Sequence, residues 1–133
     1  MGQQQLLLLV LAAVIVGAAI LLGISLFGQG AAQANQEAVV HDIMNIASRA
    51  QTWYRRPVAM GGGGRNFAGL NGNLTPINWP ASNTNGSYSI SGGNATTATI
   101  TGNGFEDGND DGTPLQVVAI ITPDSITSLT VTP

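Results

Sequence analysis

The loop spanning residues 105–113 holds the residues of this chain that come closest to a recognisable ligand set. Asp107, Asn109 and Asp111 are spaced two apart and are followed by a glycine, as at the start of a D-x-N-x-D-G calcium loop. The twelfth position of such a loop requires a bidentate glutamate, but this chain has Val118 there. The sequence therefore favours a solvated acidic turn over a calcium site, and we expect no bound metal.

His41 is the side chain that could serve as a general base near neutral pH. It lies beside Asp42, but no serine or cysteine at a recognisable spacing completes a nucleophilic site, and we expect both residues on the polar side of a helix.

The run of glycines at 61–64 lacks the Lys-Ser/Thr pair and the following helix of a phosphate-binding loop. We expect it to approach a helix closely instead. The sequence thus predicts no enzyme and no cofactor.

The charge balance excludes a basic binding surface. The chain has 4 basic and 7 acidic residues, a net charge of −3 and a charged fraction of 8%, whereas nucleic-acid-binding domains carry a basic patch. With 0 cysteines there is neither a disulfide framework nor a thiolate metal site. We expect neither nucleic acid nor a small-molecule substrate as a partner.

The longest apolar stretch runs from Leu6 to Phe27 and carries no charge. As a helix it is about 33 Å long, which is enough to cross a hydrocarbon core about 30 Å thick. Its large side chains favour membrane insertion by about 5–9 kcal/mol. The rest of the chain is too short and too polar to enclose this helix. The stretch is therefore predicted to span a membrane or to form the dry centre of a multi-subunit assembly.

A cleaved secretory signal is the remaining interpretation of this stretch. Ala32-Gln33-Ala34 has the small residues of a cleavage site. However, residues 1–5 carry no positive charge, and the apolar run exceeds the roughly 7–15 residues of a signal peptide. We therefore expect the stretch to be retained.

Beyond Ala31 the pattern becomes amphipathic. Five apolar residues recur at steps of four, three, four and three, as on one face of a helix that packs on a sheet: Val39, Ile43, Ile46, Ala50 and Trp53. Pro57 disfavours helical geometry at the residue before it. The helix should therefore end near Tyr54 or Arg55.

Gly28 and Gly30 mark the change between the two patterns. Each costs a helix about 1 kcal/mol relative to alanine, so we expect a flexible point with local stretching or unwinding there. We accordingly divide the chain into a hydrophobic helix, residues 1–30, and a head, residues 31–133. The head comprises the amphipathic half-helix, the glycine-rich loop and a β-sheet.

Residues after Ser82 favour β-strands, because short runs of Thr, Val and Ile alternate with Gly, Asn, Asp and Pro. We expect four strands, over residues 86–91, 95–101, 115–122 and 125–131. Gly92-Gly93 favours a tight hairpin turn, and Pro123-Asp124 favours a type I turn. The sequence therefore predicts an α+β fold, with a long N-terminal helix and a small four-stranded antiparallel sheet packed on its C-terminal half.

These features together resemble a mature type IV pilin. The N-terminus MGQQQ directly precedes the uncharged run LLLLVLAAVIVGAAILLGI, an amphipathic half-helix continues it, and a small antiparallel sheet follows. The segment WYRRPVAMGGGG is similar to bacterial pilin-like proteins. Two departures are evident: Gln5 stands where the family usually carries a glutamate, and 0 cysteines are present where many pilins close a loop with a disulfide.

The resemblance implies a structural subunit of an extracellular bacterial pilus, N-methylated at its first residue and held in the cytoplasmic membrane before assembly. Its partners would be further copies of the chain, the membrane and the pilus assembly machinery. In such a filament the acidic turn would face arginines of an adjacent subunit. The filament core would contain the following residues: Met1, Gln5, Leu6, Leu9, Ala13, Val16, Gly17, Ile20, Gly23 and Phe27. The alternative is a single-span membrane-anchored protein whose exterior β domain is a binding module.

Overall fold

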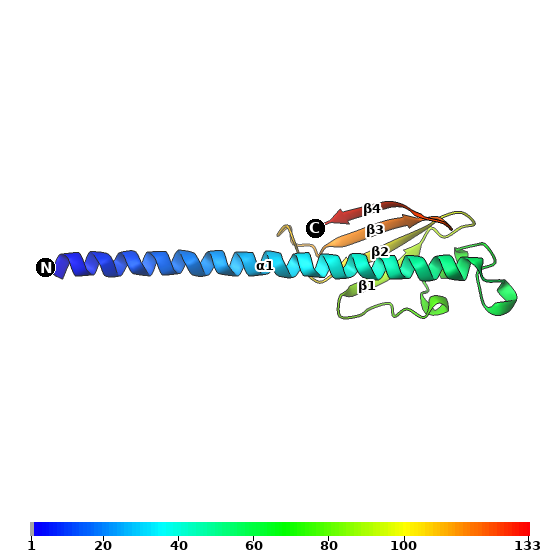
Figure 1. The fold of residues 1–133 in the computed structure, drawn as a ribbon, viewed down its shortest axis with the longest axis horizontal. Coiled ribbons are helices and arrows are strands. Elements are labelled where there is room, and N and C mark those ends of the chain that lie inside the picture. Colours follow the sequence, from blue (N-terminus) through cyan, green and yellow to red (C-terminus); the bar gives the residue numbers. More distant parts are fainter. Residues whose placement is uncertain (1) are drawn as a thin grey trace. The chain divides into compact units, whose positions relative to one another are not determined.

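The computed structural model describes residues 2–133, so the predicted core residue Met1 lies outside the described residues. The first element is the helix α1, Gly2–Arg55 (Figure 1). The chain divides after Ala31 into two compact units. The first contains only the N-terminal part of α1, whereas the second contains the rest of α1, three short 3-10 helices and four strands. The fold is therefore α+β, as predicted.

α1 is continuous through Gly28 and Gly30, and the expected stretch or unwinding is absent. The two glycines cost about 2 kcal/mol together, but they sit inside a long run of consecutive helical hydrogen bonds, and propagating a formed helix is favourable. No other side chain lies within 4 Å of the Cβ position of either glycine. Nothing in the folded chain therefore distorts the helix at this point.

The glycine-rich loop closes the end of α1, which falls within the predicted range. The N–H of Gly63 donates to the Trp53 carbonyl at 2.9 Å, and the N–H of Arg65 donates to the Tyr54 carbonyl at 2.7 Å. These bonds satisfy carbonyl groups that the end of a helix leaves free. A Cβ on Gly63 would lie 2.5 Å from the Trp53 ring. The glycines thus permit the close approach to the helix that the sequence predicted.

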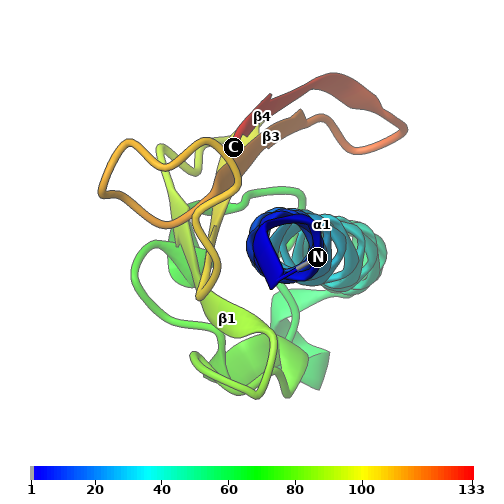
Figure 2. The same ribbon diagram turned by 90° about the vertical axis from the view of Figure 1, so that its left-hand side faces the viewer.

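The four strands form an antiparallel meander in the order β1-β2-β3-β4. Figure 2 looks along α1 and shows the sheet passing along one side of the helix, with β1 and β4 at its edges. The strand bounds are β1 Gly86–Ser91, β2 Ala98–Gly104, β3 Gln116–Ile121 and β4 Ile126–Thr132.

The connection between β1 and β2 corrects the sequence-based prediction. β2 begins at Ala98 rather than at residue 95, and no tight turn forms at Gly92-Gly93. Instead, the N–H of Gly93 donates to the Asn71 side chain at 2.7 Å. The Asn94 side chain accepts hydrogen bonds from the N–H groups of residues 96 and 97. This asparagine turn occupies the residues that a longer β2 would have used.

The core of the head lies between α1 and one face of the sheet. All five residues of the predicted helix face are buried there: Val39, Ile43, Ile46, Ala50 and Trp53. The loop after α1 adds Phe67, Leu70 and Ile77, and Trp79 packs against this core while remaining partly exposed. The head therefore has a hydrophobic core of its own.

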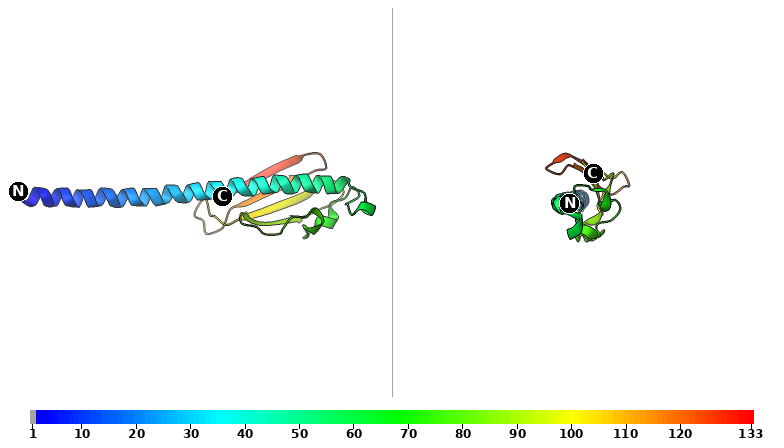
Figure 3. Two further views of the ribbon diagram at one scale, coloured as in Figure 1. Left: turned by 60° about the horizontal axis from the view of Figure 1, so that its bottom comes forward. Right: turned by 90° about the vertical axis from the view of Figure 1, so that its right-hand side faces the viewer.

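The loops of the head lie at two ends of the sheet (Figure 3). At one end, the loop between β2 and β3 is tied to the early part of the head helix, because the N–H of Phe105 donates to the Asn35 side chain at 2.9 Å. At the other end, the β3–β4 turn contacts the last residue of α1, where Arg55 donates to the Pro123 carbonyl at 2.8 Å.

The close packing of β2 on α1 predicts an intolerance to larger residues at Gly102. A Cβ there would lie 2.9 Å from both Val39 and Ile43. We expect Gly102→Val to lower the free energy of unfolding by about 1–3 kcal/mol through overpacking. Urea unfolding of the full chain in detergent, followed by tryptophan fluorescence, measures this. The control Thr101→Val, on the same strand, should change stability by less than about 0.5 kcal/mol. Equal stabilities of the two variants would contradict the prediction.

Candidate functional site

The predicted core residues of the first unit share one face of α1. At about 100° per residue they fall within an arc of about 120°, and every one of them is exposed: Gln5, Leu6, Leu9, Ala13, Val16, Gly17, Ile20, Gly23 and Phe27. Ala13 and Gly17 are four residues apart, and the Cβ position at Gly17 meets no atom within 4 Å. The helix backbone is therefore open to a close neighbour along this face.

The apolar surface of residues 6–27 is large compared with the stability of a small domain. Roughly fifteen large apolar side chains are exposed, with exposed fractions between 55% at Leu11 and 80% at Phe27. Burying such side chains is worth about 1.5–3 kcal/mol each, so the surface is worth on the order of 20 kcal/mol. Net folding stabilities are about 5–15 kcal/mol. The segment is long and apolar enough to span a membrane.

The same segment carries no ionisable side chain. The first charged residue in the sequence is Glu37, and Gln5 is a polar side chain on the face just described. A buried charge costs several kcal/mol unless it is paired, whereas a neutral amide both donates and accepts hydrogen bonds. Gln5 is thus chemically able to bind a polar group of a neighbour inside an apolar environment.

Asp42 is a site that the sequence analysis missed, because we expected it on the polar side of the helix beside His41. Its side chain is buried, with 7% exposed. The carboxylate accepts hydrogen bonds from the Tyr88 hydroxyl at 2.5 Å and from the Asn85 and Asn83 amides at 2.9 and 3.0 Å. Asp42 directly precedes Ile43, a residue of the packing face. This position was the signal in the sequence that could have predicted its burial.

The environment of Asp42 keeps its carboxylate ionised. Burial by itself raises the pKa of Asp42, but hydrogen bonds from Tyr88, Asn85 and Asn83, together with the charge of His41, bring the pKa below its usual value. Burial and the bond to Asp42 raise the pKa of Tyr88, so its hydroxyl keeps the proton that it donates. The cluster therefore links α1 to β1 by a charge-assisted hydrogen bond.

The acidic loop orders itself through its own carboxylates. Asp107 accepts a hydrogen bond from the N–H of Gly112 at 2.7 Å, and Asp111 accepts one from the Thr113 hydroxyl at 2.6 Å. The bond from Thr113 lowers the pKa of Asp111. Asn109 accepts a hydrogen bond from the Asp111 N–H at 3.2 Å. The three residues of the calcium-like motif thus lie along one largely exposed turn.

His41 is exposed and lies 3.2 Å from the Asn45 amide. In the part of the chain that the structure describes, no three His, Asp or Glu side chains are close enough to hold a metal. The structure thus places His41 with an exposed asparagine, whereas the adjacent Asp42 points into the head.

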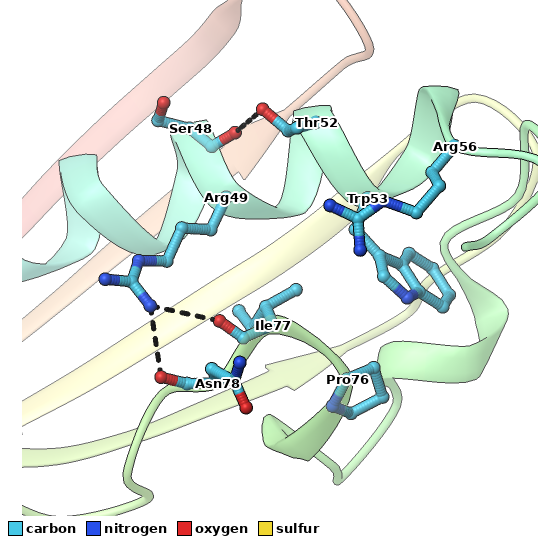
Figure 4. Close-up of a pocket in the computed structure, with 8 residues that line it drawn as sticks. All are labelled: Ser48, Arg49, Thr52, Trp53, Arg56, Pro76, Ile77 and Asn78. Atoms are coloured by element: carbon cyan, nitrogen blue, oxygen red, sulfur yellow. Dashed lines mark hydrogen bonds between the residues drawn. The ribbon is translucent and has the colours of Figure 1, made fainter. Parts of the chain in front are cut away.

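A pocket of about 220 Å³ lies beside the end of α1 (Figure 4). Arg49 donates to the carbonyls of Ile77 and Asn78 at 3.2 and 3.1 Å, which fixes one guanidinium at the rim. Arg56 directly follows the last residue of α1 and also lines the pocket. The ion pair found among residues 2–133 joins Arg55 to Asp124, so neither pocket arginine pairs with a carboxylate there. Residues lining the pocket are Ser48, Arg49, Thr52, Trp53, Arg56, Pro76, Ile77 and Asn78.

Neither a known protein family, nor a curated protein, nor a solved structure matches this chain.

The Asp42 cluster predicts a pH dependence of stability. The pKa of Asp42 in the folded chain is below its usual value of 3.8, so its contribution is complete above about pH 4 and is lost as the pH falls through the folded pKa. We expect Asp42→Asn to lower the free energy of unfolding at pH 7 by about 1.5–3 kcal/mol and to flatten the acid limb of the stability curve. Glu37→Gln, at an exposed position of the same helix, is the control. An acid limb unchanged by Asp42→Asn would contradict the prediction.

Proposed function

We propose that this chain is a structural subunit that polymerises through the apolar part of α1 into an extracellular filament of the type IV pilus kind. The observation that carries the proposal is the helix of residues 2–30, which is exposed on all sides, uncharged, and open to close packing at Ala13 and Gly17. Before assembly the same segment would sit in the cytoplasmic membrane. In the filament, neighbouring copies would replace the lipid.

The composition of the segment supports its transfer from lipid to an assembly. Residues 6–27 carry no charge that would have to stay at a membrane surface. Small residues such as Gly17 also favour helix–helix packing in apolar surroundings. A segment with these properties suits a subunit that is extracted from lipid and packed against copies of itself.

The self-contained core of the head also supports the proposal. Its core is filled by its own helix, loop and sheet, so the head has a hydrophobic core that contains no residue of the first unit. The filament would display the heads on its outside. The pilus assembly machinery would be the further partner, and the N-terminal methylation of the resembling family would apply to this subunit.

Negative-stain electron microscopy of cells that express the chain together with a pilus assembly system tests the proposal. Filaments that contain the chain support it. The alternative, a single-span membrane-anchored binding module, predicts that the chain stays in the membrane fraction and forms monodisperse detergent micelles. That result, obtained with a functional assembly system, would contradict the filament.

Close packing at Gly17 gives the next prediction. We expect Gly17→Leu to insert into membranes normally but to reduce the yield of sheared filaments about tenfold, because the leucine side chain separates neighbouring helices. Gly17→Ala is the matched control, since alanine keeps the surface small and favours the helix by about 1 kcal/mol. Filament yields that are equal for the leucine and alanine variants would refute close packing there.

Gln5 gives a prediction on docking inside the filament. The amide can accept a hydrogen bond from a neighbouring N-terminal amine, the role that a glutamate fills in the family that this chain resembles. We expect Gln5→Glu to assemble and Gln5→Leu to assemble poorly, because leucine leaves a buried donor unsatisfied at about 1–3 kcal/mol per subunit. The amount of filament pelleted after shearing measures both. Wild-type yield from Gln5→Leu would show that apolar packing alone sets the register.

A further inference from the structure

The charges of the head are separated between its two ends. Four of the seven acidic residues lie in the loop between β2 and β3: Glu106, Asp107, Asp110 and Asp111. All four arginines lie between Arg49 and Arg65, in the last turns of α1 and the loop that follows it. In Figures 1 and 3 these two segments lie at opposite ends of the sheet.

Hydrogen bonds fix this separation. The acidic loop is held at Asn35, whose side chain accepts the N–H groups of Phe105 and Glu106. The Arg-lined pocket begins at Arg49 and reaches Arg56. The helix rises by about 30 Å between Asn35 and its last residue, Arg55, which Arg56 follows. No acidic side chain of the loop can therefore reach the pocket of its own head.

The pocket is chemically suited to carboxylates. Arg49 is held at the rim by two carbonyls and lies 5.2 Å from the Trp79 ring centre, so it presents its remaining N–H donors in a fixed orientation. Arg56 brings a second guanidinium to the same pocket (Figure 4). Guanidinium groups bind carboxylates with good geometric specificity. Trp53 and Pro76 add apolar side chains to the lining of the pocket.

On the basis of the proposed filament, we infer that the pocket beside the end of α1 receives the acidic loop of a second copy of this chain. The filament would keep all α1 helices parallel, so the acidic end of one head faces the arginine end of another. A contact between unlike surfaces propagates as an open helical array when its rotation does not close into a ring. The head interface would thus be heterologous, with one loop and one pocket used per subunit.

Cysteine cross-linking tests the inference directly, because the natural chain has 0 cysteines. We expect filaments of the double variant Glu106→Cys/Arg56→Cys, treated with a short bis-maleimide, to give a ladder of covalent multimers on a denaturing gel. Each single variant should stay monomeric. The double variant Glu37→Cys/Arg56→Cys is the matched control, since Glu37 is exposed on α1 outside the loop, and it should give no ladder.

Charge reversal provides a second measurement. We expect Arg56→Glu and Glu106→Arg each to reduce filament yield about fivefold, and the combined variant to recover it. Glu37→Arg/Arg56→Glu has the same net charge as the combined variant and should not recover. Filaments of wild-type yield from both single variants, or cross-linked dimers from either single cysteine, would overturn this interface while leaving the filament intact. Absence of filaments from the wild-type chain would instead overturn the proposed function.

Discussion

The apolar surface of residues 6–27 is the constraint on which the rest of the structure depends. Its burial is worth on the order of 20 kcal/mol, which exceeds the net folding stability of a domain of this size. The head has a separate core, which is filled by the second half of α1, the loop after it and the sheet. One continuous helix therefore meets two different environments. Its first half is long and apolar enough to span a membrane, and its second half packs on a sheet on one side and faces water on the other.

The head keeps its shape without a disulfide by tying loops to the helix with polar side chains. Asp42 holds β1 through Tyr88. Further along α1, the Tyr54 hydroxyl donates to the Ala95 carbonyl at 2.7 Å, and the Gln51 amide donates to the Thr122 carbonyl at 3.0 Å. Each bond joins the helix to a different connection of the sheet. Together they place the strand connections relative to α1, which apolar contacts alone define less sharply because such contacts are non-directional.

The parts of this fold that follow a local pattern could be predicted from the sequence, and those set by distant partners could not. The helix and its packing face show in the spacing of Val39 to Trp53, and β1 and the Pro123-Asp124 turn show in short-range signals. β2 was misplaced because Asn94 and Asn71 organise the preceding turn together, although 23 residues separate them in the numbering. Asp42 was misplaced because polarity predicts exposure, whereas its three donors come from β1 and the loop before it. The arginine pocket also combines two segments that no single window of sequence contains.

The sequential order of the strands has a consequence for how the chain folds during its synthesis. Each strand pairs with its neighbour along the chain, so the loops that must close are short and the meander itself should form quickly. The bonds that dock it on α1 span far more of the chain, 46 residues for Asp42 and Tyr88 and 71 for Gln51 and Thr122. The head can therefore reach its final state only after most of the chain has emerged, whereas residues 6–27 emerge first. During synthesis the apolar segment must therefore reach an apolar environment well before the solvent-exposed head has folded.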